Sequence, residues 1–247
     1  MNILITSASR DFPKTIASVL RESHHVRLTD RVDVSTDLEF ERSDLGHDGS
    51  TNELVRGLDI IIHSGELSGD MSVSDQLDYH TRCTYNLLWA AWEEKVTSFI
   101  YLSSLSIMGQ YDHDLAVTET WRPMPSIDPS QLCYHLGEYV CKEFAREHRV
   151  EIACLRLGDI IYKDDVNDGN TSVLHVNDAV HAVDRCIKTD LSPIGDNGLY
   201  STYRQLGQPY RTLSYWNIFH IQSPVPNARF LTDRAKQTLG FKPSYEG

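Results

Sequence analysis

The sequence lacks the features that direct a chain to a membrane. No stretch approaches the roughly 20 apolar residues that a membrane-spanning helix needs, and the first residues do not pair a basic region with a long apolar core. The five cysteines are odd in number and show no Cys-x-x-Cys spacing, which is typical of reduced thiols. We therefore expect a cytoplasmic protein without a membrane partner.

Positive charge is also scarce. The formal net charge is −12 and no basic cluster stands out, so phosphate groups would be repelled over most of the surface. This excludes nucleic acid as the main partner and favours a small molecule or another protein. The length of 247 residues suits one α/β domain.

Several catalytic motifs are missing. The chain has no Gly-x-Ser-x-Gly elbow and no Walker loop. It has eleven histidines, but neither residues 112–114 (Asp-His-Asp) nor the set His175, Asp178 and His181 includes a soft ligand pair or a zinc-type spacing. We therefore predict no metal site.

Short apolar runs alternate with amphipathic stretches, which is typical of a parallel sheet covered by helices. The apolar runs predict strands at residues 2–6, 25–29, 60–63, 99–103 and 151–157. The amphipathic stretches predict helices from about Pro13 and at residues 74–94, 131–148, 176–188 and 232–239, the last with Gly240 as its C-cap. Ligands of such sheets bind at the carboxyl ends of the strands, where we expect the site.

Two segments interrupt this alternation. Residues 109–130 are polar and contain three prolines, which predicts a loop across the carboxyl edge of the sheet. Residues 189–230 contain glycine, proline and aromatic residues without a clear period. We therefore predict a single domain over residues 1–247, in which residues 189–230 contribute most of a small substrate lobe.

The turn after the first strand lies where a dinucleotide-binding turn is expected, but it has none of the usual glycines. In such turns the helix amides hold a pyrophosphate, and glycines permit the tight turn and the close approach of the phosphate. Here Ser7, Arg10 and Pro13 take the glycine positions. Their side chains would crowd a pyrophosphate, although Arg10 offers compensating charge. Cofactor contacts from this turn are assigned to Thr6, Ser7, Ser9 and Arg10; the alternative is a surface turn that binds nothing.

Asp30 ends the second predicted strand. A carboxylate at this place accepts hydrogen bonds from the adenosine ribose and repels a 2′-phosphate, which favours NAD over NADP. Arg31, the next residue, weakens that preference. An aspartate that ends a strand is alternatively a turn former.

Two segments resemble the catalytic motifs of extended short-chain dehydrogenases/reductases. Residues 101–109 (Tyr-Leu-Ser-Ser-Leu-Ser-Ile-Met-Gly) are similar to the strand and turn that carry the serine of that family, and residues 134–138 (Tyr-His-Leu-Gly-Glu) lie where it has Tyr-x-x-x-Lys. Similar segments occur in the family's order at residues 43–45, 62–65, 155–158, 175–178 and 239–243. The chain thus resembles the NAD-dependent epimerase/dehydratase group, and its short length looks most like uronate-dehydrogenase-like members.

The resemblance implies a Rossmann-type doubly wound parallel sheet, NAD as the cofactor and a sugar or sugar acid as the substrate. It assigns the substrate oxygen to Ser104 and the proton transfer to Tyr134. The other cofactor contacts that it implies are Asp44 and Leu45 at the adenine, and His63, Ser64 and Gly65 after the fourth strand. The candidates for substrate contact are Tyr111, His113 and Arg156.

Glu138 departs from the family at a catalytic position. The lysine of the family lowers the pKa of the tyrosine phenol and binds the nicotinamide ribose. A carboxylate near Tyr134 has the opposite effect and raises that pKa, although it can still accept hydrogen bonds from ribose hydroxyls. The alternative for Tyr134 is a buried helix residue without a catalytic role. His80, which replaces an asparagine of the family, is expected to be a packed residue rather than a ligand contact.

Two functional classes stay open. Retention of Ser104, Tyr134 and Asp30 favours an NAD-dependent oxidoreductase or epimerase/dehydratase-like enzyme acting on a sugar or sugar acid. Loss of the glycines and the lysine favours a non-catalytic dinucleotide- or ligand-binding relative, and a cofactor-free interaction protein is a third alternative. Family members pair through two long helices, here residues 74–94 and 131–148, so the resemblance allows a homodimer.

Overall fold

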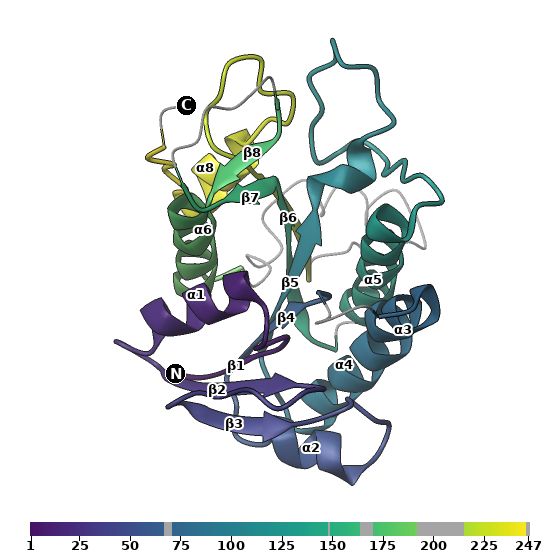
Figure 1. Ribbon diagram of the computed structural model, residues 1–247, viewed down its shortest axis with the longest axis vertical. Coiled ribbons are helices and arrows are strands. Elements are labelled where there is room, and N and C mark those ends of the chain that lie inside the picture. The colour runs from purple at the N-terminus through teal and green to yellow at the C-terminus, as the bar shows by residue number, and fades with distance from the viewer. Residues whose placement is uncertain (67–70, 148, 164–169, 192–214, 246–247) are drawn as a thin grey trace, which may run out of the picture.

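A seven-stranded parallel sheet in the order β3-β2-β1-β4-β5-β6-β9 forms the centre of the protein (Figure 1). The computed structural model describes residues 1–66, 71–147, 149–163, 170–191 and 215–245. The strands are β1 (Asn2–Ile5), β2 (His25–Asp30), β3 (Glu39–Arg42), β4 (Ile60–Ser64), β5 (Ser98–Ser104), β6 (Glu151–Leu157) and β9 (Trp216–Ile221). The predicted Rossmann-type α/β fold is confirmed.

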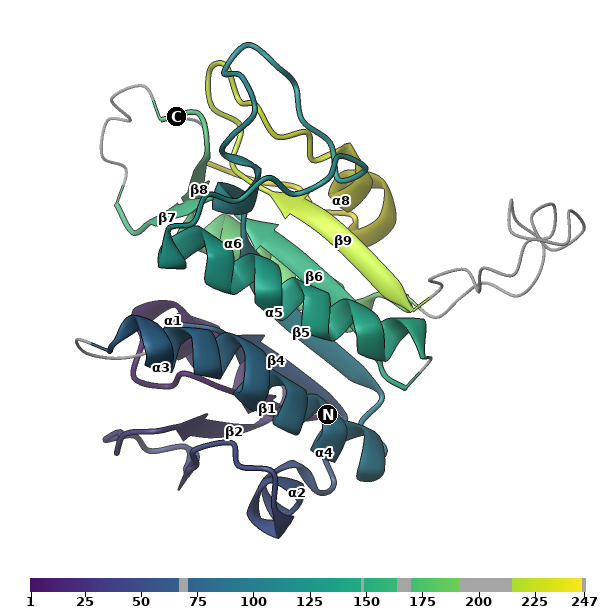
Figure 2. The ribbon, with the colours of Figure 1, turned by 90° about the vertical axis from the view of Figure 1, so that its right-hand side faces the viewer.

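Helices cover both faces of the sheet (Figures 1 and 2). One face carries α1 (Asp11–Leu20), α6 (Val176–Lys188) and α8 (Asp233–Leu239); the other carries α2 (Gly49–Val55), α3 (Val73–Asp78), α4 (Thr84–Glu93) and α5 (Pro129–Arg146). Successive residues of β1 serve the two layers, since Ile3 and Ile5 pack with α1 and α6 while Leu4 packs with α4 and α5. Burial on both faces explains why the central strands are continuous apolar runs in the sequence.

The predicted helix over residues 74–94 is interrupted by a wider turn. The structure has α3, then a π-helical turn at Tyr79–Cys83, then α4. This turn buries Tyr79, His80 and Cys83. A π turn inside a helix changes which residues face inward, and apolar periodicity gives no signal for it. At the other helix ends the differences are small: α1 begins at Asp11 rather than Pro13, and Gly240 ends α8 at φ 68° as expected.

Several short elements were missed by the sequence analysis. Strand β3 is an edge strand with a single apolar residue, Phe40, and α2 has only 7 residues. A parallel pair, β7 (Asp159–Ile161) and β8 (Val173–His175), forms a second small sheet. None of these elements is long enough to set up a recognisable period.

The predicted substrate lobe receives a partial correction. Strand β9 lies within residues 189–230, yet it pairs with β6 in the main sheet. Residues 192–214 lie outside the described residues, so their assignment to a lobe stays a prediction. Residues 109–128 contain no strand or α-helix, and they reach the C-terminal part through the bridge of Val117 with Phe230. Among the described helices, none is both long and apolar enough to cross a membrane.

Candidate functional site

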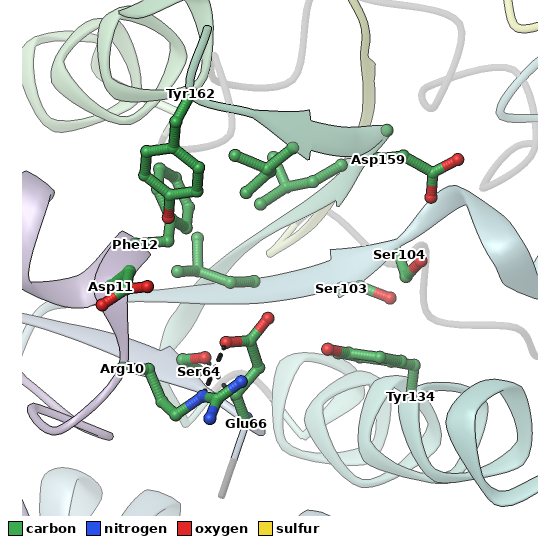
Figure 3. A pocket seen from close by; sticks show the side chains of 14 residues that line it. Arg10, Asp11, Phe12, Ser64, Glu66, Ser103, Ser104, Tyr134, Asp159 and Tyr162 are labelled. Carbon is green, nitrogen blue, oxygen red and sulfur yellow. Dashed lines mark hydrogen bonds and ion pairs between the residues drawn. The ribbon is translucent and has the colours of Figure 1, made fainter. Parts of the chain in front are cut away.

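A cavity of about 310 Å³ lies at the carboxyl edge of the sheet, where ligands of open α/β sheets bind (Figure 3). It brings together the start of α1, the ends of β4 and β5, the phenol of Tyr134 from α5, and the segment from β6 to β7. Of the residues assigned to the site from the sequence, it is lined by Arg10, Ser64, Ser104 and Tyr134. The turn after β1, which is predicted to bind the cofactor, and the pair Ser104 and Tyr134 therefore surround one cavity.

The turn from Thr6 to Arg10 forms without glycine. Ser7 adopts φ 57°, a left-handed conformation that normally favours glycine. Its hydroxyl donates to the carbonyl of Ser64 at 2.9 Å. Thr6 also bonds to β4, since its hydroxyl accepts from the amide of Ser64 at 3.0 Å. Both side chains are buried and fasten β1 to β4. A cofactor contact of Thr6 and Ser7 is thereby limited to their backbone and stays a prediction.

Asp30 is held by the same turn. Its carboxylate accepts from the amide of Ser9 at 2.9 Å and from that of Val32 at 3.2 Å, and the residue is 3% exposed. Asp30 therefore holds the glycine-free turn in place through hydrogen bonds. In this conformation its carboxylate does not face a ribose site. The hydroxyl oxygen of Ser9 is buried and has no hydrogen-bond partner among the described residues.

The two residues predicted at the adenine differ in exposure, and their contact with a cofactor stays a prediction. Asp44 is exposed, and one of its carboxylate oxygens lies 3.4 Å from the Arg31 side chain. Leu45 is buried; its carbonyl accepts from the Asn86 side chain and its amide donates to Ser43. Neither Asp44 nor Leu45 lines the cavity of Tyr134.

His63 does not line a dinucleotide site, contrary to the sequence-based expectation. It is fully buried between β4 and α4, where its ring nitrogens lie 2.9 Å from the hydroxyls of Thr6 and Thr84. Burial, together with a smaller effect of the neighbouring His80, lowers the pKa of His63 to about 3. The ring is therefore neutral and serves the core.

Gly65 provides room for a second buried histidine. A Cβ atom at Gly65 would overlap the ring of His80. His80 bonds to the hydroxyl of Tyr101 through Nδ1 at 2.9 Å, and its ring packs edge-on against Tyr134 with centroids 4.9 Å apart. His80 is a packed residue, as expected. Its ring also holds the Tyr134 ring in place through this contact.

Ser104 and Tyr134 face the cavity from β5 and α5 (Figure 3). The Ser104 hydroxyl donates to the hydroxyl of Ser106 at 2.9 Å and accepts from the Ser106 amide at 3.1 Å. The phenol of Tyr134 makes no hydrogen bond to a described residue, so it is available to a ligand. The pKa of Tyr134 is raised, first by burial and then by Glu66, while Arg10 opposes this.

Glu138 points away from this cavity. Its carboxylate forms a two-pronged ion pair with Arg156, with N–O distances of 2.7 and 2.9 Å, and accepts from the Ser103 hydroxyl at 2.6 Å. Both partners are almost fully buried. The predictions that Glu138 faces the cofactor and that Arg156 reaches substrate are therefore wrong. The high pKa of Tyr134 follows from burial and Glu66 rather than from Glu138.

Tyr111 and His113 belong to a separate contact. The Tyr111 hydroxyl donates to the carbonyl of Arg122 at 2.7 Å, and Nδ1 of His113 lies 3.2 Å from the Arg229 guanidinium. Neither residue lines the cavity. They close residues 109–128 onto the C-terminal part, which corrects their assignment as substrate contacts.

The sequence analysis missed part of the cavity wall. Glu66 lies beside Arg10, 3.4 Å from its guanidinium, and Asp159 and Tyr162 come from the β7 segment and the residue after it (Figure 3). Glu66 could have been found, because it follows the end of β4 by two residues. The β7 segment has no motif that would reveal it.

The buried histidines make the fold sensitive to acid. Burial lowers the pKa of His63 to about 3 and that of His80 to about 4, below the ordinary value of 6.5. As the pH falls, these histidines are protonated in the unfolded chain before they are protonated in the folded protein. The stability that their neutral, buried rings contribute is therefore complete above pH 6.5 and is lost as the pH falls. We expect the free energy of unfolding to fall by ~1.4 kcal/mol per pH unit for each histidine between about pH 6 and pH 4.

Urea unfolding at a series of pH values measures this slope. His80→Asn should flatten it, whereas the same change at the exposed His25 should leave it as it is. Equal slopes in wild type and His80→Asn would contradict the assignment.

Comparison with known families and structures agrees with this geometry. Residues 13–181 match the NAD dependent epimerase/dehydratase family, and the chain belongs to that family. Uronate dehydrogenase from Agrobacterium tumefaciens, as a variant complexed with NAD, superposes with a TM-score of 0.79 at 18% identity, covering 99% of this chain and 84% of that one. Glucuronic acid dehydrogenase from Chromohalobacter salexigens gives 0.76 at 22% identity, covering 99% and 84%. UDP-N-acetylglucosamine 4-epimerase from Bacillus cereus gives 0.74 at 16% identity, covering 100% and 94%. A comparison with curated protein sequences gives no significant match.

The family is NAD-dependent, and the residues present fit one part of NAD better than the other. The amides of Asp11 and Phe12 at the start of α1 and the guanidinium of Arg10 suit a diphosphate, whereas the carboxylates of Asp11 and Glu66 in the same wall oppose it. The ion pair of Arg10 with Glu66 is exposed and long, so releasing it costs less than ~1 kcal/mol. The nicotinamide ribose has no lysine to bind it, because residue 138 is a glutamate. The carboxylate of Glu138 cannot take over this role, since it is bound to Arg156.

Proposed function

We propose that this protein is a non-catalytic, ligand-binding member of its family. It binds NAD through the first turn of α1 and a sugar-like molecule beside Ser104 and Tyr134, and it does not oxidise that molecule. The sugar-like ligand is suggested by the names of structural neighbours, which are dehydrogenases of sugar acids and epimerases of sugar nucleotides.

The state of Tyr134 carries this proposal. A phenol acts as a proton acceptor near neutral pH only when a neighbouring cation lowers its pKa from about 10. Around Tyr134 burial and Glu66 raise the pKa, and Arg10, which opposes them, is itself paired with Glu66. The phenol therefore stays protonated.

A protonated phenol still binds. When NAD is bound it supplies a hydride acceptor, but abstraction of the substrate proton needs a base, and Tyr134 is not one. Its hydroxyl instead donates a hydrogen bond to an oxygen of the ligand. Where that oxygen belongs to a hydroxyl group, Ser104 accepts a hydrogen bond from it through the lone pair that Ser106 leaves free. Arg10 holds the diphosphate.

Calorimetry with NAD and NADP, followed by an assay of NADH formation with glucuronate, tests the proposal. We expect NAD to bind, Arg10→Ala to weaken that binding by about tenfold through loss of a charge-assisted contact, and no NADH to form at neutral pH. Lys14→Ala, on the exposed side of α1, is the matched control and should bind as wild type. Absence of NAD binding would contradict the proposal.

An NAD-dependent oxidoreductase or epimerase is the second candidate, favoured because Ser104 and Tyr134 share one cavity. The same assay separates the non-catalytic protein from a dehydrogenase; an epimerase regenerates NAD and is detected instead by analysis of the sugar product. NADH formation that disappears in Tyr134→Phe would establish the enzyme and overturn the non-catalytic proposal.

A further inference from the structure

A second cavity, of about 230 Å³, lies beside α5 between residues 119–123 and β9. Figure 2 shows α5 running along this side of the sheet, next to β9. Tyr134 faces the first cavity, whereas His135, Tyr139 and Lys142 of the same helix line the second one. The two spaces are therefore distinct.

The ion pair of Glu138 and Arg156 lines the inner part of the second cavity. Since Glu138 is neutralised by Arg156 and Glu119 accepts from the amide of His220 at 3.1 Å, both carboxylates are engaged by groups of the protein. The cations at the entrance differ. The side chains of Arg122 and Lys142 have no ion-pair or hydrogen-bond partner within the described parts of the chain.

His135 forms part of the wall beside this ion pair. Nδ1 of His135 is buried and has no partner among the residues that the structure describes. Burial lowers the pKa of His135, with Arg156 and Lys142 acting in the same direction and Glu138 opposing them. The neutral ring therefore adds no charge to the wall, and its Nδ1 is closed off from the cavity.

The remaining wall is aromatic. Trp121 is held edge-on by Tyr111 with ring centroids 4.9 Å apart, and Trp216 and Tyr139 face the same space. Flat side chains of this kind bind a ring, and free cations bind its anionic substituent. The volume of about 230 Å³ lies below the usual range of about 300–1,000 Å³ for ligand pockets, which limits the occupant to one ring.

We propose that this cavity binds a small aromatic anion, a ring that carries one carboxylate or phosphate. Lys142 and Arg122 contact the anionic group, and Trp121 and Trp216 contact the ring. The site is independent of the function proposed for the Tyr134 cavity. It depends on Glu138, since a lysine at this position would leave Arg156 unpaired.

Calorimetric titration with phenyl phosphate, benzoate and benzyl alcohol tests the site in the full chain. We expect at least one of the two anions to bind and neutral benzyl alcohol to bind at least about tenfold more weakly. The better of the two anions identifies the substituent. Arg122→Glu and Lys142→Glu should each lower the affinity for the anion by about tenfold or more. Tyr134→Phe should leave that affinity unchanged.

The matched control is Lys14→Glu, an exposed lysine of α1 with the same change of charge. It should bind the anion as wild type does, and thermal unfolding checks that all variants fold. The proposal is overturned if neither anion binds, if benzyl alcohol binds as well as the anions, or if the Arg122 and Lys142 variants match Lys14→Glu.

Discussion

Replacing Glu138 with alanine is expected to lower the free energy of unfolding by ~3–5 kcal/mol, because it leaves the Arg156 guanidinium buried without its counter-ion. Arg156 is 1% exposed and bonds to both carboxylate oxygens of Glu138. Burial lowers its pKa, but Glu138 outweighs this and the net pKa is raised. The hydroxyl of Ser103 also loses its acceptor. Urea unfolding at neutral pH measures the loss.

Two further variants show that burial is the cause. Glu143 lies on the same helix and pairs with Arg146 in solvent, so Glu143→Ala should cost less than ~1 kcal/mol. Replacing Glu138 and Arg156 together by methionine should recover most of the stability, because no charge is then left unpaired. A loss in Glu138→Ala no larger than in Glu143→Ala would show that the ion pair does not hold α5 to β6.

The ion pair of Glu138 with Arg156 explains why the motif at residues 134–138 does not predict the direction of the Glu138 side chain. The pattern Tyr-x-x-x-Glu identified the position and the family, but not the direction of the side chain. A glutamate with an arginine on the adjacent strand turns toward that cation and away from the cofactor. Restoring the lysine of the family by one substitution would place two cations in contact.

The general architecture could be predicted from the sequence because buried parallel strands leave continuous apolar runs. The strands predicted at residues 60–63 and 99–103 correspond to β4 and β5, whose ends differ from the prediction by at most one residue. The convergence of Arg10, Ser64, Ser104 and Tyr134 could also be predicted, since carboxyl ends of parallel strands meet at one edge.

The orientation of the polar side chains could not be predicted. His63 follows a strand, as a ligand contact would, yet its ring lies in the core between two threonines. Asp30 ends a strand, but it bonds to the glycine-free turn. In both cases a partner distant in sequence decides the direction, and no local pattern encodes it.

Gly65→Ala is expected to have the second large effect. The added methyl group would overlap the ring of His80, which is held by Tyr101 and cannot move freely. Forcing a methyl group into a packed core costs about 1–3 kcal/mol. Because His80 packs on the ring of Tyr134, the phenol should be displaced and ligand binding in its cavity weakened. Urea unfolding and calorimetry measure the two effects.

A double-mutant cycle identifies the overlap as the cause. His80→Ala removes the ring, so Gly65→Ala should cost little in that background, and the two changes should be less destabilising together than the sum of each alone. Gly49→Ala is the matched control, since no atom lies within 4 Å of its added Cβ. If Gly65→Ala is as mild as Gly49→Ala, the packing of His80 does not fix Tyr134. If the cost is unchanged without His80, the strain arises elsewhere in the turn after β4.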